Sequence, residues 1–323
     1  MGSIERPSLQ RIDRAEVDKI IQAIIEDGGV IIKNFASREA VERVNADTRP
    51  YLDNDKPWKG DLFPPETRRC TRLTARSKTY RDEWLVDSLV DKILSVFVDK
   101  TTHNYYGETK HVYTSNAIIN TALTMEIGPG GKAQRLHRDD KNHHVAHLDQ
   151  TKTGYQVGSD VSLAFLVPGI DTTYENGATL AVPGSHLWDS DRVPKVEEAV
   201  YAEMNVGDSL CFLGGLYHAG GHNLTQDQKR PMHGLFFCRG YLRTEVDYDS
   251  LNCFRQIIHE NAYLSYSTEE VLSWSYKVQA RMGYTVSSPN IGFVDFIQPY
   301  KYLAGDYDAP EDVDKSQEPV KTS

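Results

Sequence analysis

The middle of the sequence constrains the fold most, because five short apolar runs follow one another there without a helical pattern between them. Clusters of Gly, Pro, Asn and Asp separate these runs, which cover Ala117–Ile127, Val161–Val167, Ala178–Val182, Asp208–Leu213 and His233–Tyr241. Strands of this length, joined without helices, favour an antiparallel sandwich over a parallel sheet with helical crossovers. We therefore expect a mainly β fold whose core is a double-stranded β-helix, that is, a cupin-like jelly roll.

The two flanks of this β-rich region carry helical patterns. Apolar residues recur at helical spacing in Arg14–Asp27, and a Gly-Gly pair follows as a stop. Val30–Ala36 is typical of a buried strand, and Ser37 after it is a good N-cap for a second helix. Further helices are predicted at Trp84–Lys100 and Ser267–Met282. The core is thus expected between flanking α-helices.

These patterns predict one domain over residues 1–305 of the 323 residues. Its parts are a helical N-terminal part to about 110, a jelly-roll core from about 111 to 245 and a C-terminal helical part. Residues 306–323 are acidic and poor in large apolar groups, so we expect a mobile tail. Asp61–Leu73 is predicted either as a lid over the active site or as a plain surface crossing. Lys141–Asp160 has the look of an insert and is the other candidate lid.

Composition excludes several classes of partner. A net charge of −10 argues against nucleic-acid or anionic-membrane binding, which would need a basic face. There is no apolar stretch of membrane-spanning length and no secretion signal, so we expect a cytoplasmic protein. The four cysteines form no CxxC pair and are expected as reduced, mostly buried thiols: Cys70, Cys211, Cys238 and Cys253.

The stretch "AQRLHRDDKNHH" holds the first half of a candidate metal site. His137 and Asp139 are two residues apart, so on an extended segment both face the same side while Arg138 faces the other. Asp140 should point away from the ion, as a solvated or loop-bracing carboxylate. Two histidines with one carboxylate suit non-haem Fe(II), because the open positions can receive a co-substrate and oxygen. A second histidine should therefore lie on a distant strand.

That second histidine is predicted in "GDSLCFLGGLYHAGGHN". His218 ends the apolar strand directly, whereas Gly220-Gly221 lets the chain turn away before the rival His222. Arg230 comes twelve residues after His218, at the start of the next strand, and a hairpin would return it to the metal. Its planar fork could bind the distal carboxylate of a dicarboxylate such as 2-oxoglutarate.

The segments "QRLHRDD", "ENGATLAVPGSH" and "GDSLCFLGGLYHAGGHN", together with Arg230, resemble the phytanoyl-CoA dioxygenase family of Fe(II)/2-oxoglutarate oxygenases, particularly its fungal natural-product branch. The resemblance implies an iron triad of His137, Asp139 and His218, with Arg230 on the distal carboxylate of 2-oxoglutarate. It also implies that Gln134 and Thr179 contact the co-substrate, and that Asn176-Gly177 is an architectural turn.

The resemblance further implies an enzyme that uses Fe(II), 2-oxoglutarate and O2 to oxidise a bulky terpenoid or alkaloid intermediate, such as a fungal meroterpenoid. The outcome could be hydroxylation, desaturation, rearrangement or endoperoxidation. It also suggests a homodimer in which C-terminal or loop segments help close the neighbouring pocket. Two alternatives stay open: an acyl-CoA hydroxylase of primary metabolism, and a non-catalytic jelly-roll binding protein.

The remaining histidines are not expected to bind the metal. His143, His144 and His147 are predicted on an exposed loop over the pocket, and His186 and His233 as hydrogen-bonded structural residues.

Overall fold

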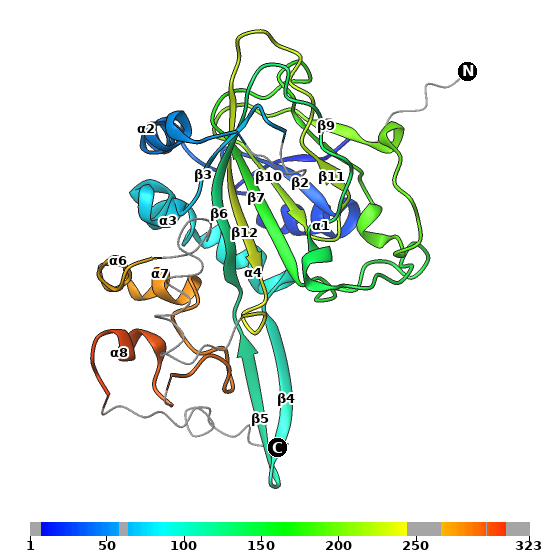
Figure 1. Cartoon of the computed structure of the whole chain (residues 1–323). Helices are drawn as coiled ribbons and strands as arrows, with labels where there is room; N and C mark the ends of the chain where they lie inside the picture. Colours follow the sequence, from blue (N-terminus) through cyan, green and yellow to red (C-terminus); the bar gives the residue numbers. More distant parts are fainter. Residues whose placement is uncertain (1–7, 58–63, 244–265, 295, 308–323) are drawn as a thin grey trace.

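Two β-sheets form the core of the computed structural model, which describes residues 8–57, 64–243, 266–294 and 296–307 (Figure 1). The larger sheet has the order β1-β2-β10-β7-β12-β6-β3, and the smaller one β11-β8-β9. All neighbouring strands are antiparallel except the pair β1 and β2. The predicted mainly β, jelly-roll fold is therefore confirmed. The strands of the large sheet are β1 (Arg11–Asp13), β2 (Gly29–Lys33), β10 (Ser209–Leu213), β7 (Ser162–Pro168), β12 (Arg230–Cys238), β6 (Ile118–Ile127) and β3 (Thr67–Cys70); those of the small sheet are β11 (His218–Ala219), β8 (Thr179–Ala181) and β9 (Val200–Ala202).

The large sheet is buried on both faces, and successive residues of its strands belong to two different clusters. In β7, Leu163, Phe165 and Val167 join the apolar cluster that the helices share, whereas Ala164 and Leu166 join the cluster inside the roll. This follows from the two-residue period of a strand, which sends neighbouring side chains to opposite faces. It also explains why the central strands are continuously apolar in sequence rather than alternating.

Helices cover the outer face of the large sheet. They are α1 (Val17–Asp27), α2 (Arg38–Asn54), α3 (Leu73–Arg76) and α4 (Ser88–Phe97), with a turn of π-helix at Tyr80–Trp84. The predicted start of α2 is confirmed, because the side-chain oxygen of Ser37 accepts the Ala40 N–H at 3.1 Å. The helix predicted at Trp84–Lys100 begins later, at Ser88, where Asp87 provides the N-cap.

The C-terminal helical segment is shorter and more broken than its sequence pattern predicts. In place of one helix over Ser267–Met282 there are two, α6 (Thr268–Leu272) and α7 (Tyr276–Arg281). The side chain of Ser275 caps α7 by accepting the Val278 N–H, and a cap of this kind starts a new helix rather than continuing the old one. The last helix is α8 (Pro299–Leu303), and 3₁₀ turns lie at Asp140–His143, Ser185–Leu187 and Val196–Glu198.

A β-hairpin replaces the end of the predicted helical region. Its strands are β4 (Lys100–Tyr106) and β5 (Thr109–Ser115), and it projects away from the body of the molecule (Figure 1). The turn between them contains Gly107, at a φ of +62° that glycine adopts without strain. The segment Asp61–Leu73 also differs, since β3 within it pairs with β6 as an edge strand.

Cys70, Cys211 and Cys238 are buried and free, as predicted, whereas Cys253 lies outside the described residues. Among the described helices, none combines the length and the apolar character that crossing a membrane requires. The division into one domain over 1–305 stays a prediction, and most of the acidic tail lies outside the described residues.

Candidate active site

A cavity of about 330 Å³ opens between the two sheets, and it contains every residue that the sequence assigned to iron or 2-oxoglutarate. Strands β6, β7, β10 and β12 supply one wall, and β8 and β11 contribute the opposite side. Much of the wall is apolar. The apolar lining includes Leu123, Met125, Leu166, Phe212, Met232 and Phe236.

His137 and His218 are brought together by their own backbones. The two residues form an isolated antiparallel bridge, in which each N–H donates to the other's carbonyl at 2.9 Å. Asp139 is placed beside them because its N–H donates to the carbonyl of Gly214, at the end of β10, at 2.9 Å. The Asp139 carboxylate lies 3.6 Å from Nε2 of each imidazole. The three potential ligand atoms all lie within 4.8 Å of one another.

Backbone carbonyls orient both imidazoles. Nδ1 of His137 lies 2.8 Å from the carbonyl of Arg135, and Nδ1 of His218 lies 3.0 Å from that of Leu216. A carbonyl only accepts, so each Nδ1 carries the proton and each Nε2 keeps its lone pair for a ligand. Burial, together with the neighbouring His218, lowers the pKa of His137, which favours the neutral form that binds a metal.

The donor set fits a divalent cation. Oδ2 of Asp139 is buried without a hydrogen-bond partner among the described residues. A buried carboxylate oxygen without a partner is costly, and a cation held between it and two neutral imidazoles would remove that cost. Two histidines and one carboxylate on a common face match the arrangement that non-haem Fe(II) prefers. Rival His222 is exposed and lies outside this cluster.

Arg230 lies in the same cavity and is 2% exposed. Its Nε donates to the carbonyl of Asn176 at 3.1 Å, and no carboxylate of the described residues forms an ion pair with its guanidinium. Burial lowers its pKa to about 10, so the group stays charged at neutral pH. A buried cation of this kind is ready for an anionic ligand, and its planar fork suits a carboxylate.

The two remaining predicted contacts also line the cavity. Oε1 of Gln134 accepts the Gly220 N–H at 2.9 Å, which fixes the side chain next to β11. Thr179 in β8 is 4% exposed. The predicted turn at Asn176-Gly177 is present, with a φ of +87° at Gly177 and the backbone of Gly221 2.8 Å from where a β-carbon would lie.

Three polar residues behind the triad were not predicted from the sequence as a group. Asp140 is 1% exposed, and its Oδ2 lies 2.9 Å from Nε2 of His147. Asp160 is also buried; it accepts the Tyr155 hydroxyl at 2.8 Å, and burial raises its pKa to about 6. The prediction that His147 sits on an exposed loop is therefore wrong, because the loop folds inward to meet Asp140. Of its neighbours, His144 is exposed and His143 lines the cavity.

The structural roles predicted for two other histidines are confirmed. His186 is hydrogen-bonded to the Ile25 carbonyl at 3.1 Å, and His233 contacts Thr124 at 2.8 Å and Asn45 at 3.0 Å.

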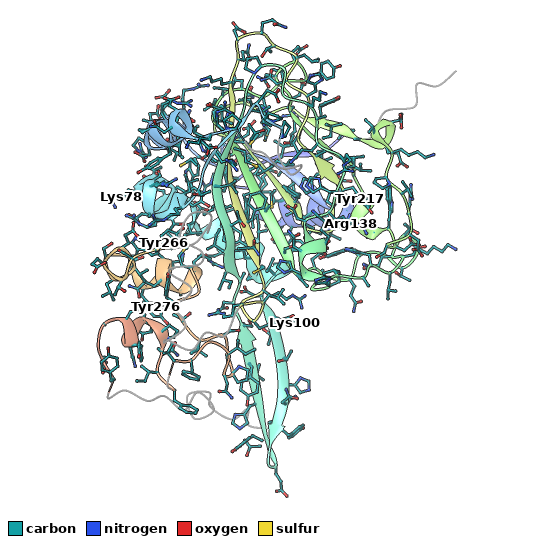
Figure 2. All side chains as sticks on the ribbon, viewed as in Figure 1. Lys78, Lys100, Arg138, Tyr217, Tyr266 and Tyr276 are labelled. Atoms are coloured by element: carbon teal, nitrogen blue, oxygen red, sulfur yellow. The ribbon has the colours of Figure 1, made fainter. Side chains whose placement is uncertain are left out.

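Arg138 points away from the cavity, as the strand period predicts. Its guanidinium donates to the carbonyls of Gly215, Ser185 and Trp188 at 2.8–2.9 Å. It also lies over the ring of Tyr217, 4.4 Å from the centroid, and the two side chains are seen together in Figure 2. Arg138 therefore connects the segment that carries His137 and Asp139 to Gly215 and to the turn at Ser185–Trp188.

The two candidate lids are both attached to the body where they are described. Pro64 and Thr67 line the cavity, but β3 fixes this segment to the sheet, and residues 58–63 lie outside the described residues. In Lys141–Asp160, the N–H of Gln150 donates to the carbonyl of Leu187 at 2.7 Å. A lid motion of either segment stays a prediction.

Comparisons with known proteins agree with this geometry. The family described as "Phytanoyl-CoA dioxygenase (PhyH)" matches residues 24–232. "Dioxygenase swnH1" of Metarhizium robertsii is 34% identical, with 88% of each chain covered, and "Dioxygenase swnH1" of Arthroderma benhamiae is 32% identical, with 92% of each covered. Among solved structures, the non-haem α-ketoglutarate-dependent carbocyclase SnoK from nogalamycin biosynthesis has a TM-score of 0.50 at 15% identity, covering 69% of this chain and 83% of that one, which shows a shared fold.

Proposed function

The chain belongs to the phytanoyl-CoA dioxygenase family and is an Fe(II)/2-oxoglutarate-dependent dioxygenase, and we propose that it oxidises a bulky secondary-metabolite intermediate. One observation carries the proposal. A converging two-histidine, one-carboxylate cluster shares its cavity with a buried arginine that has no carboxylate partner among the described residues. The cluster supplies a metal's ligands, and the arginine supplies a counter-charge for a dicarboxylate.

We assign the roles as follows. His137, Asp139 and His218 would hold the Fe(II), with the protonated Nδ1 atoms keeping both imidazoles in the binding tautomer. Arg230 would bind the distal carboxylate of 2-oxoglutarate, and Gln134 and Thr179 would contact the rest of it. When bound, the iron and 2-oxoglutarate together supply the activation of O2 that oxidation of an unreactive C–H bond needs.

The chain's own contribution is positioning and the exclusion of water. The apolar residues of β6, β7 and β12 in the cavity wall would hold an apolar substrate next to the open face of the metal. The position of the substrate carbon then decides between hydroxylation, desaturation, rearrangement and endoperoxidation.

A terpenoid or alkaloid of fungal secondary metabolism, such as a meroterpenoid, is the substrate class we propose. The relatives that carry the name dioxygenase come from fungi, and the cavity wall is largely apolar, which suits a carbon skeleton with few charges. The cavity volume of about 330 Å³ is at the small end for such ligands, so part of a large skeleton would extend past the mouth.

An acyl-CoA hydroxylase is the second candidate, and one observation favours it. Lys132 and Lys141 line the cavity, and cationic side chains at its mouth would suit the phosphates of coenzyme A. The two candidates share the same metal chemistry and differ only in what binds at the mouth.

Two assays test the proposal. First, anaerobic addition of Fe(II) and 2-oxoglutarate should produce a weak visible charge-transfer band, at roughly 500 nm for chelation at such a site. Second, succinate release should increase with a terpenoid or alkaloid from a candidate panel; an increase with acyl-CoA instead would favour the second candidate. A protein that shows neither the band nor succinate would be the non-catalytic binder.

The choice of second histidine has a matched test. His218→Ala should lose stoichiometric Fe(II) binding, while His222→Ala should retain it, because only His218 belongs to the cluster. The reverse result would contradict our assignment.

A homodimeric state and a cytoplasmic location complete the proposal, both carried over from the sequence. Light scattering of the purified protein and microscopy of a tagged chain would test them.

A further inference from the structure

A second cluster of titratable side chains lies directly behind the triad, and the proposed reaction does not use it. Asp140, His147 and Asp160 converge on Gly215, where an added methyl group would lie 2.8 Å from the imidazole of His147 and 3.1–3.3 Å from the two carboxylates. None of the four residues lines the cavity. The cluster therefore does not contact the substrate, and three buried ionisable groups in one place need another explanation.

The contact between Asp140 and His147 has no competitor. Oδ2 of Asp140 and Nε2 of His147 are 2.9 Å apart, and neither atom forms a hydrogen bond with any of the described residues, so each is the other's nearest polar contact of opposite kind. Both side chains are at most 9% exposed, so little water screens the contact. Removing one member of a buried pair of this kind is unfavourable, because the remaining group stays buried and unpaired.

This pair is joined to the metal centre through the backbone. Asp139 and Asp140 are neighbours, and both of their N–H groups donate to the carbonyl of Gly214, at 2.9 and 3.3 Å. Their side chains leave in different directions, one into the cavity and the other toward His147. Whatever fixes the side chain of Asp140 therefore also fixes the direction in which Asp139 points.

The three candidate ligands differ in how they are supported. A backbone carbonyl holds Nδ1 of each histidine, as described above. The carboxylate of Asp139 accepts no hydrogen bond from the described residues, and its Oδ2 is buried. Its aim is therefore set by its backbone alone, and the neighbouring Asp140 is the anchor of that backbone.

The far end of the anchor is itself fixed. The N–H of His147 donates to the hydroxyl of Ser190 at 2.9 Å, and the N–H of Ser190 donates back to the carbonyl of His147 at 3.2 Å. Asp160, on the other side of Gly215, is held by Tyr155 and by Arg239, whose Nε donates to its backbone carbonyl at 3.0 Å. A rigid anchor can define an atom position, whereas an anchor on a mobile loop could not.

We propose that Asp140 and His147 are positioning residues of the metal centre, whose buried contact aims the carboxylate of Asp139 at the ion. The inference rests on the proposed function, because it requires Asp139 to be a metal ligand. It goes beyond it by assigning a role to two residues, Asp140 and His147, that do not line the cavity.

The test is an anaerobic titration of the metal-free protein with Co(II), whose visible bands report the coordination geometry. His147→Leu should raise the dissociation constant for Co(II) by about 10- to 100-fold and change the shape of the visible bands at saturation. His147→Gln carries an amide N–H in place of the imidazole, and it should recover affinity to within about threefold of the wild type. Rescue by a donor of similar reach separates aiming from mere filling of space.

A matched control covers general destabilisation. His233→Gln alters a buried histidine that contacts Thr124 and Asn45 and does not line the cavity, and it should lower the melting temperature without changing the Co(II) affinity or spectrum. If His147→Leu does not fold, Ser190→Ala replaces it, since that change only releases the His147 backbone and should weaken Co(II) binding by about threefold.

Two results would overturn the inference in distinguishable ways. Wild-type affinity and band shape in His147→Leu, or in Ser190→Ala if it must serve instead, would show that the pair only stabilises the fold. Co(II) binding by the wild type that is no stronger than that of His137→Ala would remove the metal site itself, and the proposed function with it.

Discussion

Two buried arginines lie on opposite sides of the candidate metal centre, and they differ in how far their donors are used. Arg138, whose side chain points away from the cavity, is 6% exposed and donates to four backbone carbonyls. Arg230, in the cavity, is 2% exposed and donates through Nε to a single carbonyl. Both side chains are therefore buried, but the guanidinium of Arg138 forms more hydrogen bonds with the protein than that of Arg230 does. The saturated group maintains the shape of the protein, and the unsatisfied one is ready for a ligand.

The adjacent carboxylates differ in what they face. Oδ2 of Asp140 lies 2.9 Å from Nε2 of His147 and away from the cavity, while Asp139 lines the cavity, and neither Oδ2 has a hydrogen-bond partner among the described residues. Two residues next to each other in sequence, and identical in chemistry, thus belong to different regions. Access to the cavity, rather than burial or charge, separates these two carboxylates.

The largest effect should come from Asp139→Ala. Loss of one ligand should lower 2-oxoglutarate-dependent succinate formation by on the order of 1000-fold, because the ion is no longer held. Since no described residue donates to Oδ2, the free energy of unfolding of the metal-free protein should change by less than about 1 kcal/mol. Succinate assays and urea titrations measure the two quantities. Retained turnover would contradict the ligand role of Asp139, and a large loss of stability would indicate a structural role for it.

Replacing each arginine by methionine should separate the two regions. Arg138→Met removes a donor from four carbonyls, of which that of Ser185 keeps the Trp188 N–H, and should lower the free energy of unfolding by about 3 kcal/mol, a factor of roughly 100 in the unfolding equilibrium. Arg230→Met removes a buried charge without a carboxylate partner, so stability should stay level or rise. Its KM for 2-oxoglutarate should rise by about 100-fold, as expected when one partner of a buried charge pair is lost.

The control for this pair is to measure both quantities on both variants. Equal destabilisation by the two substitutions would show that satisfaction of the donors does not distinguish the arginines. An unchanged KM in Arg230→Met would remove that residue from the co-substrate site.

A finer change at the same position is Arg230→Lys. The charge is retained, but a planar fork is replaced by a point donor, so the KM for 2-oxoglutarate should rise by about tenfold while stability changes little. Initial rates of succinate release at saturating Fe(II) give the value. A tenfold fall in kcat at constant KM would instead indicate that the arginine acts on the reaction rather than on binding.

Sequence patterns located the parts of the site that depend on local structure. His137 and Asp139 share a face because the strand period is two, and His218 is found at the end of an apolar strand. Arg230 was found through the expected hairpin return, although β12 pairs with β6 and β7 rather than with β11. For these residues, spacing along one or two strands carries the geometry.

The groups that sequence missed come together only through the tertiary fold. Asp140, His147 and Asp160 lie within residues 140–160 and meet at Gly215, which comes much later in the chain, and no spacing rule brings them together. The hairpin of β4 and β5 was missed for another reason, since its turn at Gly107 carries a signal that the preceding helical pattern obscured. Local signals can be read more closely, but convergence behind a metal centre requires the structure.

The smallest effect concerns acid stability, and it tests whether a buried histidine that does not line the cavity behaves as a neutral structural group. Burial lowers the pKa of His186 to about 4 and that of His233 to about 3, from the usual 6.5. The unfolded chain binds these protons at a higher pH than the fold does, so stability is complete above pH 6.5 and falls as the pH drops toward 4. Asp160, whose pKa is raised to about 6, opposes this in part, because the folded protein takes up its proton at a higher pH than the unfolded chain does.

Urea midpoints at pH 7 and pH 5 should therefore differ more for the wild type than for His233→Gln, which keeps polar atoms for Thr124 and Asn45 but does not titrate. The same substitution at the exposed His103 should leave the difference unchanged. An equal loss of stability in His233→Gln and the wild type would show that the acid sensitivity arises from groups other than His233.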